Sequence, residues 1–351
     1  MTQQPSAQLA NRRRNRLLFV GLTCLDIVYV CRHFPVEDSD QRALDSQWRR
    51  GGNASNNCTV FRQLLHWWSS NNRSAAAAAA ADTTDYEIEF MGTIGGDHAS
   101  RFLVDDLLAN GILIDNIVRH PDRQCPSSTV IINQSNGSRT IVHFNRNLPD
   151  LDGQSMANHI TESLDRYLHI HFEGLRNVPN IRQMIAQIRD RDVNHEITVS
   201  VELEKVYKPL TELLDNAEDF GKYIDIYFVE KEFAGEILDY TDADQTAVGI
   251  ASRLHPGALV VCPWGESGAV AYDNRIGQLY RSPVYPPKSG SVVDTLGAGD
   301  TFLSGTLFGL LVVGLSVEDA IKMGCQVAGA KCGQWYHKEM SSQGIPKEQG
   351  I

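Results

Sequence analysis

The segment with the clearest chemical potential is Gly297-Ala298-Gly299-Asp300, which stands just before an apolar stretch over 303–313. Glycines before a helix let the backbone approach a phosphate, and the free N–H groups at the helix N-terminus favour negative charge. Asp300 could accept the proton of an attacking hydroxyl group. A plain loop with an aspartate that caps the helix is the alternative, and the segment alone leaves both hypotheses open.

A second polar segment, Gly52-Asn53-Ala54-Ser55-Asn56, precedes a predicted helix over 58–65. The side-chain amides of Asn53 and Asn56 each offer donors and an acceptor, which suits a ligand with many hydroxyl groups. Their spacing of three residues places both amides on one helix face. The alternative is that these polar residues only cap the helix.

Two further sets of polar residues lie within apolar segments. Asp26 stands at the end of an apolar strand, where an unpaired buried carboxylate is costly, so we expect it to meet either a basic partner or sugar hydroxyls. His169 and His171 alternate along another predicted strand. Because no other residues with metal-ligand spacing accompany them, we interpret them as core or edge histidines.

The elements that must position these residues are predicted from continuous apolar runs. Such runs are typical of parallel strands buried on both faces, and helical patterns such as 181–189 separate several of them. This alternation predicts an α/β fold with a doubly wound, mostly parallel sheet flanked by helices. The predicted strands are 17–21, 87–91, 168–172, 197–201, 224–229 and 258–262.

Two excursions, at about 27–50 and 127–146, interrupt this pattern. In both, β-branched residues alternate with polar ones, and the second contains the turn Asn136-Gly137. We predict a small antiparallel β-sheet assembled from the two excursions. Placed over the carboxyl edge of the main sheet, it would serve as a lid.

The remaining segments are predicted to lie outside this core. We expect a disordered tail over 1–16, one main domain over 17–340 and a second tail over 341–351. A low-complexity insert at about 69–85 contains seven consecutive alanines. Seven residues are too few for a stable isolated helix, so we expect a mobile loop there.

Composition narrows the class of partner. A formal net charge of −11 argues against binding to nucleic acid or to anionic lipid, and favours a small-molecule ligand. The basic run at 12–16 precedes an apolar stretch, a pattern similar to that of a secretory signal. Asp26 within the apolar stretch would cost about 2.5–3.5 kcal/mol in a membrane, so a buried first strand fits better. Seven scattered cysteines without a C-x-x-C pair predict reduced thiols in a cytoplasmic protein.

Taken in order, these motifs resemble those of the ribokinase-like carbohydrate kinases, and most of all the ketohexokinase group of that family. The likeness spans residues 17–333, and no G-x-x-x-x-G-K-[ST] loop of a nucleotide hydrolase is present. The segments that carry it are Gly21 to Asp26, 50–56, 102–107, 129–133, 136–140, 199–202, 294–302 and 324–329.

The resemblance implies transfer of the ATP γ-phosphoryl group to the 1-hydroxyl of D-fructose or a related ketose, with Asp300 as the base. It also implies Mg²⁺, activation by K⁺, and a homodimer formed through the lid. Implied sugar ligands are Asp26, Gly52, Asn53, Asn56 and Asp300; implied ATP ligands are Arg139, Gly265, Glu266, Ser267, Gly268, Gly297, Ala298 and Gly299.

One departure limits this transfer of roles. Where many family members have Asn-x-x-Glu after a strand, this chain has Glu230-Lys231-Glu232-Phe233, so we assign no metal ligand there. Two alternatives stay open, namely a related kinase for another sugar or a nucleoside, and a non-catalytic sugar-binding relative. The intact Asp300 and both motif glycines argue against the second.

Overall fold

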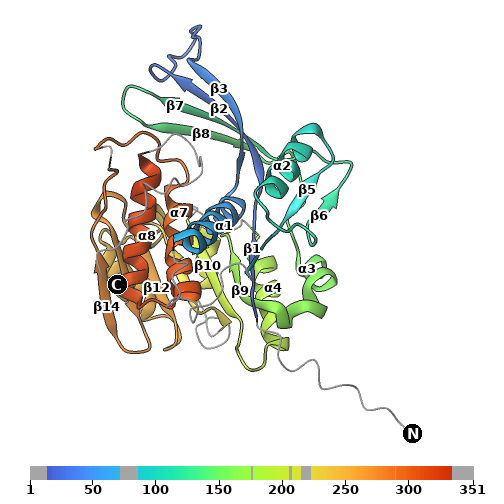
Figure 1. Ribbon diagram of the computed structural model, residues 1–351, viewed down its shortest axis with the longest axis vertical. Helices are drawn as coiled ribbons and strands as arrows, with labels where there is room; N and C mark the ends of the chain where they lie inside the picture. The colour runs from blue at the N-terminus through green and yellow to red at the C-terminus, as the bar shows by residue number, and fades with distance from the viewer. Residues whose placement is uncertain are drawn as a thin grey trace.

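The computed structural model describes residues 14–71, 86–174, 177–204, 208–214, 223–288 and 290–333. A large sheet with helices forms the body, and a small sheet projects from it (Figure 1). The first strand begins at Arg16, and residues 1–13 of the tail predicted over 1–16 lie outside the described residues. Most of the predicted insert and the tail over 341–351 lie outside the described residues.

The large sheet has the strand order β14-β13-β12-β11-β10-β9-β1-β4. The six strands from β12 to β4 pair in parallel, and β13 pairs antiparallel with both β12 and β14, so the predicted mostly parallel α/β sheet is confirmed. Their bounds are β1 Arg16–Val20, β4 Glu87–Met91, β9 Tyr167–Phe172, β10 Thr198–Leu203, β11 Ile226–Val229, β12 Leu259–Pro263, β13 Ala269–Asp273 and β14 Gln278–Ser282.

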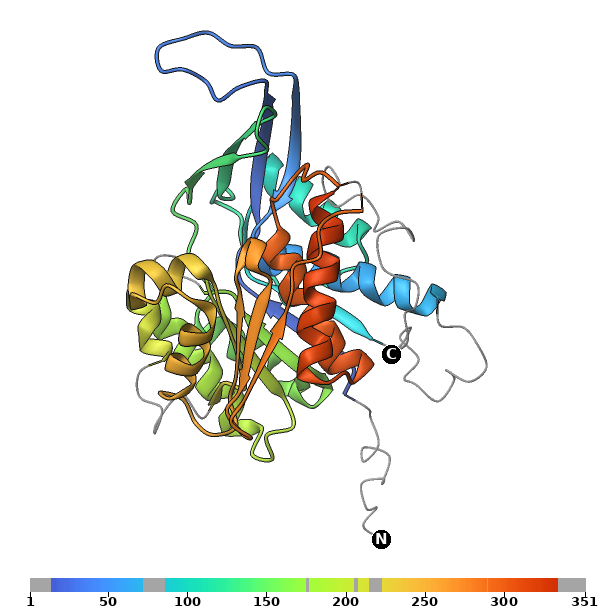
Figure 2. The same cartoon turned by 90° about the vertical axis from the view of Figure 1, so that its left-hand side faces the viewer.

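Helices cover both faces of this sheet (Figure 2). Along β1, Leu17 and Phe19 join the core on one face, whereas Leu18 and Val20 join the core on the other. Burial on both sides explains why the strands are apolar without alternation. One face packs against α1 Asn53–Asn71, α2 His98–Ala109, α7 Ala298–Phe308 and α8 Val317–Cys332, the other against α3 Gly153–Ile160, α4 Val178–Arg191, α5 Lys231–Leu238 and α6 Ala243–Ala251.

Short helical turns complete the described secondary structure. The 3₁₀ turns are Thr161–Arg166, Lys208–Leu213 and Gly265–Ser267, and a π-helical turn, Gly309–Val313, follows α7. In the described part of the chain, no helix is both long and apolar enough to cross a membrane.

The two excursions build one sheet, which we call the small sheet, with the order β3-β2-β7-β8. Its strands are β2 Cys24–Cys31, β3 Asp45–Gly51, β7 Ser127–Asn133 and β8 Arg139–Phe144. The prediction of a wholly antiparallel sheet is wrong, because β2 and β7 pair in parallel. Each excursion is an antiparallel hairpin, and the two hairpins join side by side. A further pair, β5 Thr93–Gly95 with β6 Val118–His120, was not predicted.

His169 and His171 are both buried in the core, in agreement with their interpretation as core or edge histidines, and the buried Ser200 lies between them. The Ser200 hydroxyl is 3.0 Å from His169 Nε2 and 2.8 Å from His171 Nδ1. Burial lowers the pKa of His169 to about 3 and that of His171 well below its usual value. Both imidazoles are therefore neutral in the folded protein at neutral pH.

Folding stability should fall as the pH is lowered from 7 to 5. Below its unfolded pKa of 6.5, His169 binds a proton in the unfolded chain but not in the folded one, which costs about 2 kcal/mol at pH 5. His169→Gln removes the titratable group and keeps a polar partner for Ser200, so its stability should depend less on pH. Urea unfolding at both pH values measures this, and identical pH dependence in the two proteins would contradict it.

Candidate active site

Acidic residues stand at the carboxyl ends of three neighbouring parallel strands. Glu173 follows β9, Glu202 lies near the end of β10 and Glu204 follows it, and Glu230 follows β11. Parallel strands end at the same edge of a sheet, which is where ligands of open α/β folds bind. Burial raises the pKa of Glu202 well above its usual value, and the charges of Glu204, Asp300, Glu230 and Glu173 raise it further. We call these five residues the acidic edge.

The segment from Gly52 onward is fixed against this edge. Gly52 has a φ of +100°, and a Cβ there would lie 2.2 Å from the Leu22 carbonyl oxygen, so only glycine fits. Glu173 Oε2 accepts hydrogen bonds from the backbone N–H groups of Leu22 at 2.8 Å and Ala54 at 3.1 Å. One buried carboxylate thus joins the end of β1 to the start of α1.

The amides of Asn53 and Asn56 lie in the first turn of α1, which begins five residues earlier than the predicted helix over 58–65. Asn53 Nδ2 donates to Glu202 Oε2 at 3.2 Å and to Glu204 Oε2 at 2.5 Å. Asn56 Nδ2 donates to Asp300 Oδ2 at 2.8 Å. A carboxylate only accepts, so these contacts fix both amide orientations and leave each Oδ1 for a donor such as a hydroxyl group.

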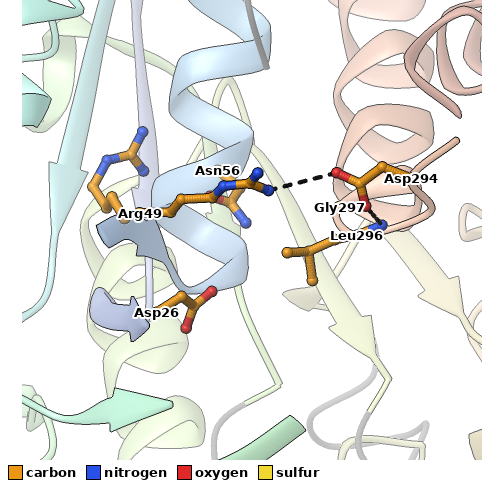
Figure 3. Close-up of a pocket in the computed structure, with 7 residues that line it drawn as sticks. Asp26, Arg49, Asn56, Asp294, Leu296 and Gly297 are labelled. Carbon is orange, nitrogen blue, oxygen red and sulfur yellow. Dashed lines mark hydrogen bonds and ion pairs between the residues drawn. The ribbon is translucent and has the colours of Figure 1, made fainter. Parts of the chain in front are cut away.

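Asp26 is buried in β2, opposite Arg49 of β3. Burial raises the pKa of its carboxyl group, while hydrogen bonds from Ser128 and Cys24 and the charges of Arg49 and Arg50 oppose that rise. Asp26 therefore has basic neighbours and also faces a pocket (Figure 3). The pocket is lined by Asp26, Arg49, Arg50, Asn56, Asp294, Leu296 and Gly297.

Gly297 precedes α7, and Ala298 and Gly299 are its first residues. We call these three residues the phosphoryl loop, after the role that the resemblance implies for them. Gly297 has a φ of +76° and is the N-cap of α7. A Cβ on Gly299 would lie 2.6 Å from Glu230 Oε1. Asp300 is buried in the first helical turn and accepts from Asn56, so it is not the N-cap that the alternative interpretation required.

The remaining predicted ATP ligands lie in two other places. Arg139 Nη1 donates to Thr295 Oγ1 at 2.8 Å, two residues before the phosphoryl loop. The turn formed by Gly265, Glu266, Ser267 and Gly268 follows β12. Gly268 has a φ of +86°, and a Cβ there would lie 2.1 Å from the Ser282 carbonyl oxygen. Contact of this turn with ATP stays a prediction.

The sequence interpretation gave no role to the four glutamates of the acidic edge. A signal was present, because each is an acidic residue at the carboxyl end of a predicted apolar strand. Glu230 opens the segment in which the family motif is absent, yet its carboxylate lies beside Gly299. No group of three or more metal-ligating side chains is found among the residues that the structure describes.

Comparison with known proteins identifies the family. Residues 14–340 match the family model described as pfkB family carbohydrate kinase. The chain belongs to the pfkB family. Ketohexokinase of Mus musculus is 37% identical over 322 residues, which cover 91% of this chain and 96% of that protein. A 5-dehydro-2-deoxygluconokinase of Listeria monocytogenes is 23% identical, with 91% and 90% covered.

Solved structures agree on the fold. A ribokinase from Arabidopsis thaliana, complexed with ribose and ATP, superimposes with a TM-score of 0.68 at 18% identity, with 94% of this chain and 96% of that chain covered. An adenosine kinase from Sinorhizobium meliloti gives 0.70 at 17% identity, with 94% and 98% covered. As a member of the pfkB family, this protein is an ATP-dependent carbohydrate kinase. The predicted enzyme class is confirmed.

Gly299→Ala should lower kcat while the protein stays folded. The added methyl group meets Glu230 Oε1, the end of a flexible side chain that can move, and it covers backbone that we predict to bind a phosphate. A misplacement of about 1 Å can cost about 10²-fold in rate. Gly235→Ala in α5 is the matched control, since its methyl group meets only an ordinary 3.7 Å contact. Steady-state kinetics and melting temperature measure both variants, and full kcat in Gly299→Ala would contradict the assignment.

Proposed function

We propose that this enzyme transfers the γ-phosphoryl group of ATP to the 1-hydroxyl of D-fructose or a related ketose, giving fructose 1-phosphate and ADP. The hydrogen bond between Asn56 and Asp300 carries the proposal, because it brings a polyol-binding amide and a candidate base within reach of one hydroxyl group. The similarity to mouse ketohexokinase over 91% of the chain supports a ketose as the acceptor.

In this proposal the sugar lies in the pocket beside Asp26. The Asp26 carboxylate accepts hydrogen bonds from sugar hydroxyls, and the carbonyl oxygens of Asn53 and Asn56 accept others. Gly52 leaves room for the ring because it has no side chain. Asp300 accepts the proton of the reacting sugar hydroxyl while the oxygen of that hydroxyl bonds to the γ-phosphorus. The bond from that phosphorus to the bridging oxygen breaks, and ADP leaves.

The phosphoryl loop supplies positive potential in this step. Backbone N–H groups at the N-terminus of α7 stabilise the negative charge that develops on the transferred group. Arg139 and the turn from Gly265 to Gly268 bind the rest of the nucleotide. Phosphoryl transfer depends mainly on such positioning and charge stabilisation, with little covalent chemistry by the protein.

Magnesium fits this arrangement as a companion of the ATP phosphates. Mg²⁺ is usually held by one or two carboxylates together with substrate phosphates, and it neutralises charge on the phosphate oxygens. Glu230, next to Gly299, would hold it. Activation by K⁺ is also part of the proposal, and turnover in potassium compared with choline salts tests it.

We also propose a homodimer formed through the small sheet, which would then act as a lid. Large apolar side chains are exposed on this sheet, including Trp48, Ile141, Val142 and Phe144. A second copy of the chain would cover them. Light scattering of the purified protein tests this assembly.

The cytoplasm is the proposed location, supported by seven free cysteine thiols in the described chain.

The function is tested by measuring ATP consumption against a panel of ketoses, aldoses and nucleosides. Phosphate on C1 of fructose, assigned by NMR, is the expected product. Turnover only with ribose or adenosine would replace the ketose by another acceptor, and binding of sugar without any turnover would favour a non-catalytic relative.

Asp300→Asn should fold normally and bind ATP and sugar, because asparagine has nearly the same shape. The amide has negligible basicity, so kcat should fall by about 10²–10⁴, the usual effect of removing a positioned general base. Asp273→Asn is the control, a buried aspartate at the end of β13. Stopped assays for kcat and calorimetry for binding measure both variants. Near-normal turnover in Asp300→Asn would show that Asp300 is not the base.

A further inference from the structure

Three consecutive residues before the phosphoryl loop contact the small sheet. Asp294 Oδ2 lies 3.6 Å from Arg49 Nη1 on β3, and Figure 3 draws this ion pair. Thr295 Oγ1 accepts a hydrogen bond of 2.8 Å from Arg139 on β8. Leu296 packs against the small apolar cluster of the sheet, which consists of Val28, Val130 and Ile132. The position of the small sheet and that of the loop are therefore linked.

Asp294 is the buried centre of this contact. Its Oδ1 accepts from the backbone N–H of Leu296 at 2.8 Å, which shapes the turn into the phosphoryl loop. Lys331, near the end of α8, lies 3.3 Å from Oδ2 and donates to the Asp294 carbonyl oxygen at 2.9 Å. Lys331 belongs to the body of the protein, whereas Arg49 belongs to the small sheet. Asp294 thus joins the two parts through one carboxylate.

Arg49 also interacts with the predicted sugar ligand Asp26. The two residues are directly opposite each other in the pairing of β2 and β3, and the charge of Arg49 opposes the rise that burial causes in the pKa of Asp26. Arg49 therefore forms an ion pair with the buried Asp294, and its charge also acts on the buried Asp26 across the strand pair. When a ligand donates hydrogen bonds to Asp26, that carboxylate needs less stabilisation from the charge of Arg49. The Arg49 guanidinium can then interact more strongly with Asp294.

We propose that Arg49 is a positioning residue that couples sugar binding at Asp26 to ATP binding at the phosphoryl loop, through Asp294. This inference rests on the sugar and phosphoryl sites of the proposed function. Sugar hydroxyls that bind Asp26 strengthen the pair between Arg49 and Asp294, and the loop is then held with its N–H groups ready for phosphate. Binding free energies are reciprocal, so ATP strengthens sugar binding by the same factor.

The test is the affinity for a non-hydrolysable ATP analogue, measured by calorimetry with and without saturating fructose. In the unmodified enzyme, fructose should tighten analogue binding by about fivefold or more, the lower range of allosteric coupling. Arg49→Gln should lose most of this ratio, because glutamine keeps a polar side chain beside Asp294 but no charge. Arg49→Lys restores the charge and should recover part of the ratio.

Two further variants separate coupling from folding. Arg281→Gln removes an exposed arginine that pairs with Asp244 on the edge of the large sheet, and it should keep the full ratio. Leu296→Ala keeps every charge but removes the apolar contact with the small sheet, and it should reduce the ratio even if Arg49→Gln does not fold.

The outcomes also separate this inference from the proposed function. An unchanged ratio in both Arg49→Gln and Leu296→Ala overturns the coupling, and so does an unmodified enzyme that phosphorylates its sugar but shows no effect of that sugar on analogue binding. If the acceptor panel identifies another sugar, the ketose assignment is wrong. The coupling is then tested by measuring the affinity for the ATP analogue with and without that other sugar.

Discussion

Glu202 is buried among four other carboxylates at the carboxyl edge of the large sheet, and this concentration of negative charge constrains everything around it. Buried charges are tolerated only when donors or positive potential compensate them. The structure supplies these as backbone N–H groups for Glu173 and as amides for Glu202, Glu204 and Asp300. The segment from Gly52 to Asn56 is therefore a source of donors for the acidic edge as well as a candidate sugar site.

The same constraint governs what can bind. A triphosphate would be repelled from the charged carboxylates of the acidic edge unless positive charge came with it or was already present. The N-terminus of α7 and its glycines offer fixed positive potential, and a divalent cation bound to the phosphates would supply the rest. Arg49 and Lys331 add their charges at Asp294, beside the loop rather than in it. Charge balance thus links the proposed nucleotide site to the small sheet.

The sequence predicts the parts of this arrangement that local chemistry dictates. Buried strands such as β1 are predicted from their continuous apolar residues, because both of their faces are covered. Gly52 and Gly297 are predicted as places of close backbone approach, and the structure gives both a positive φ. The parallel pairing of β2 with β7 could not be predicted, since turn signals report only on neighbouring strands. The early start of α1 was also missed, because its first turn is held by carboxylates that are distant in sequence.

If Asp300 is the base, its hydrogen bond with Asn56 has a consequence for the order of events. The Asn56 amide already occupies one acceptor position of the Asp300 carboxylate, so a hydroxyl group must share or displace that contact to reach Oδ2. Water could occupy the same place, and transfer to water would waste ATP. A loop that is held firmly only when sugar occupies Asp26 would reduce that loss, because phosphate and base would be aligned chiefly in the presence of the acceptor. The connection from Asp26 through Arg49 to Asp294 would then contribute to selectivity against water as well as to affinity.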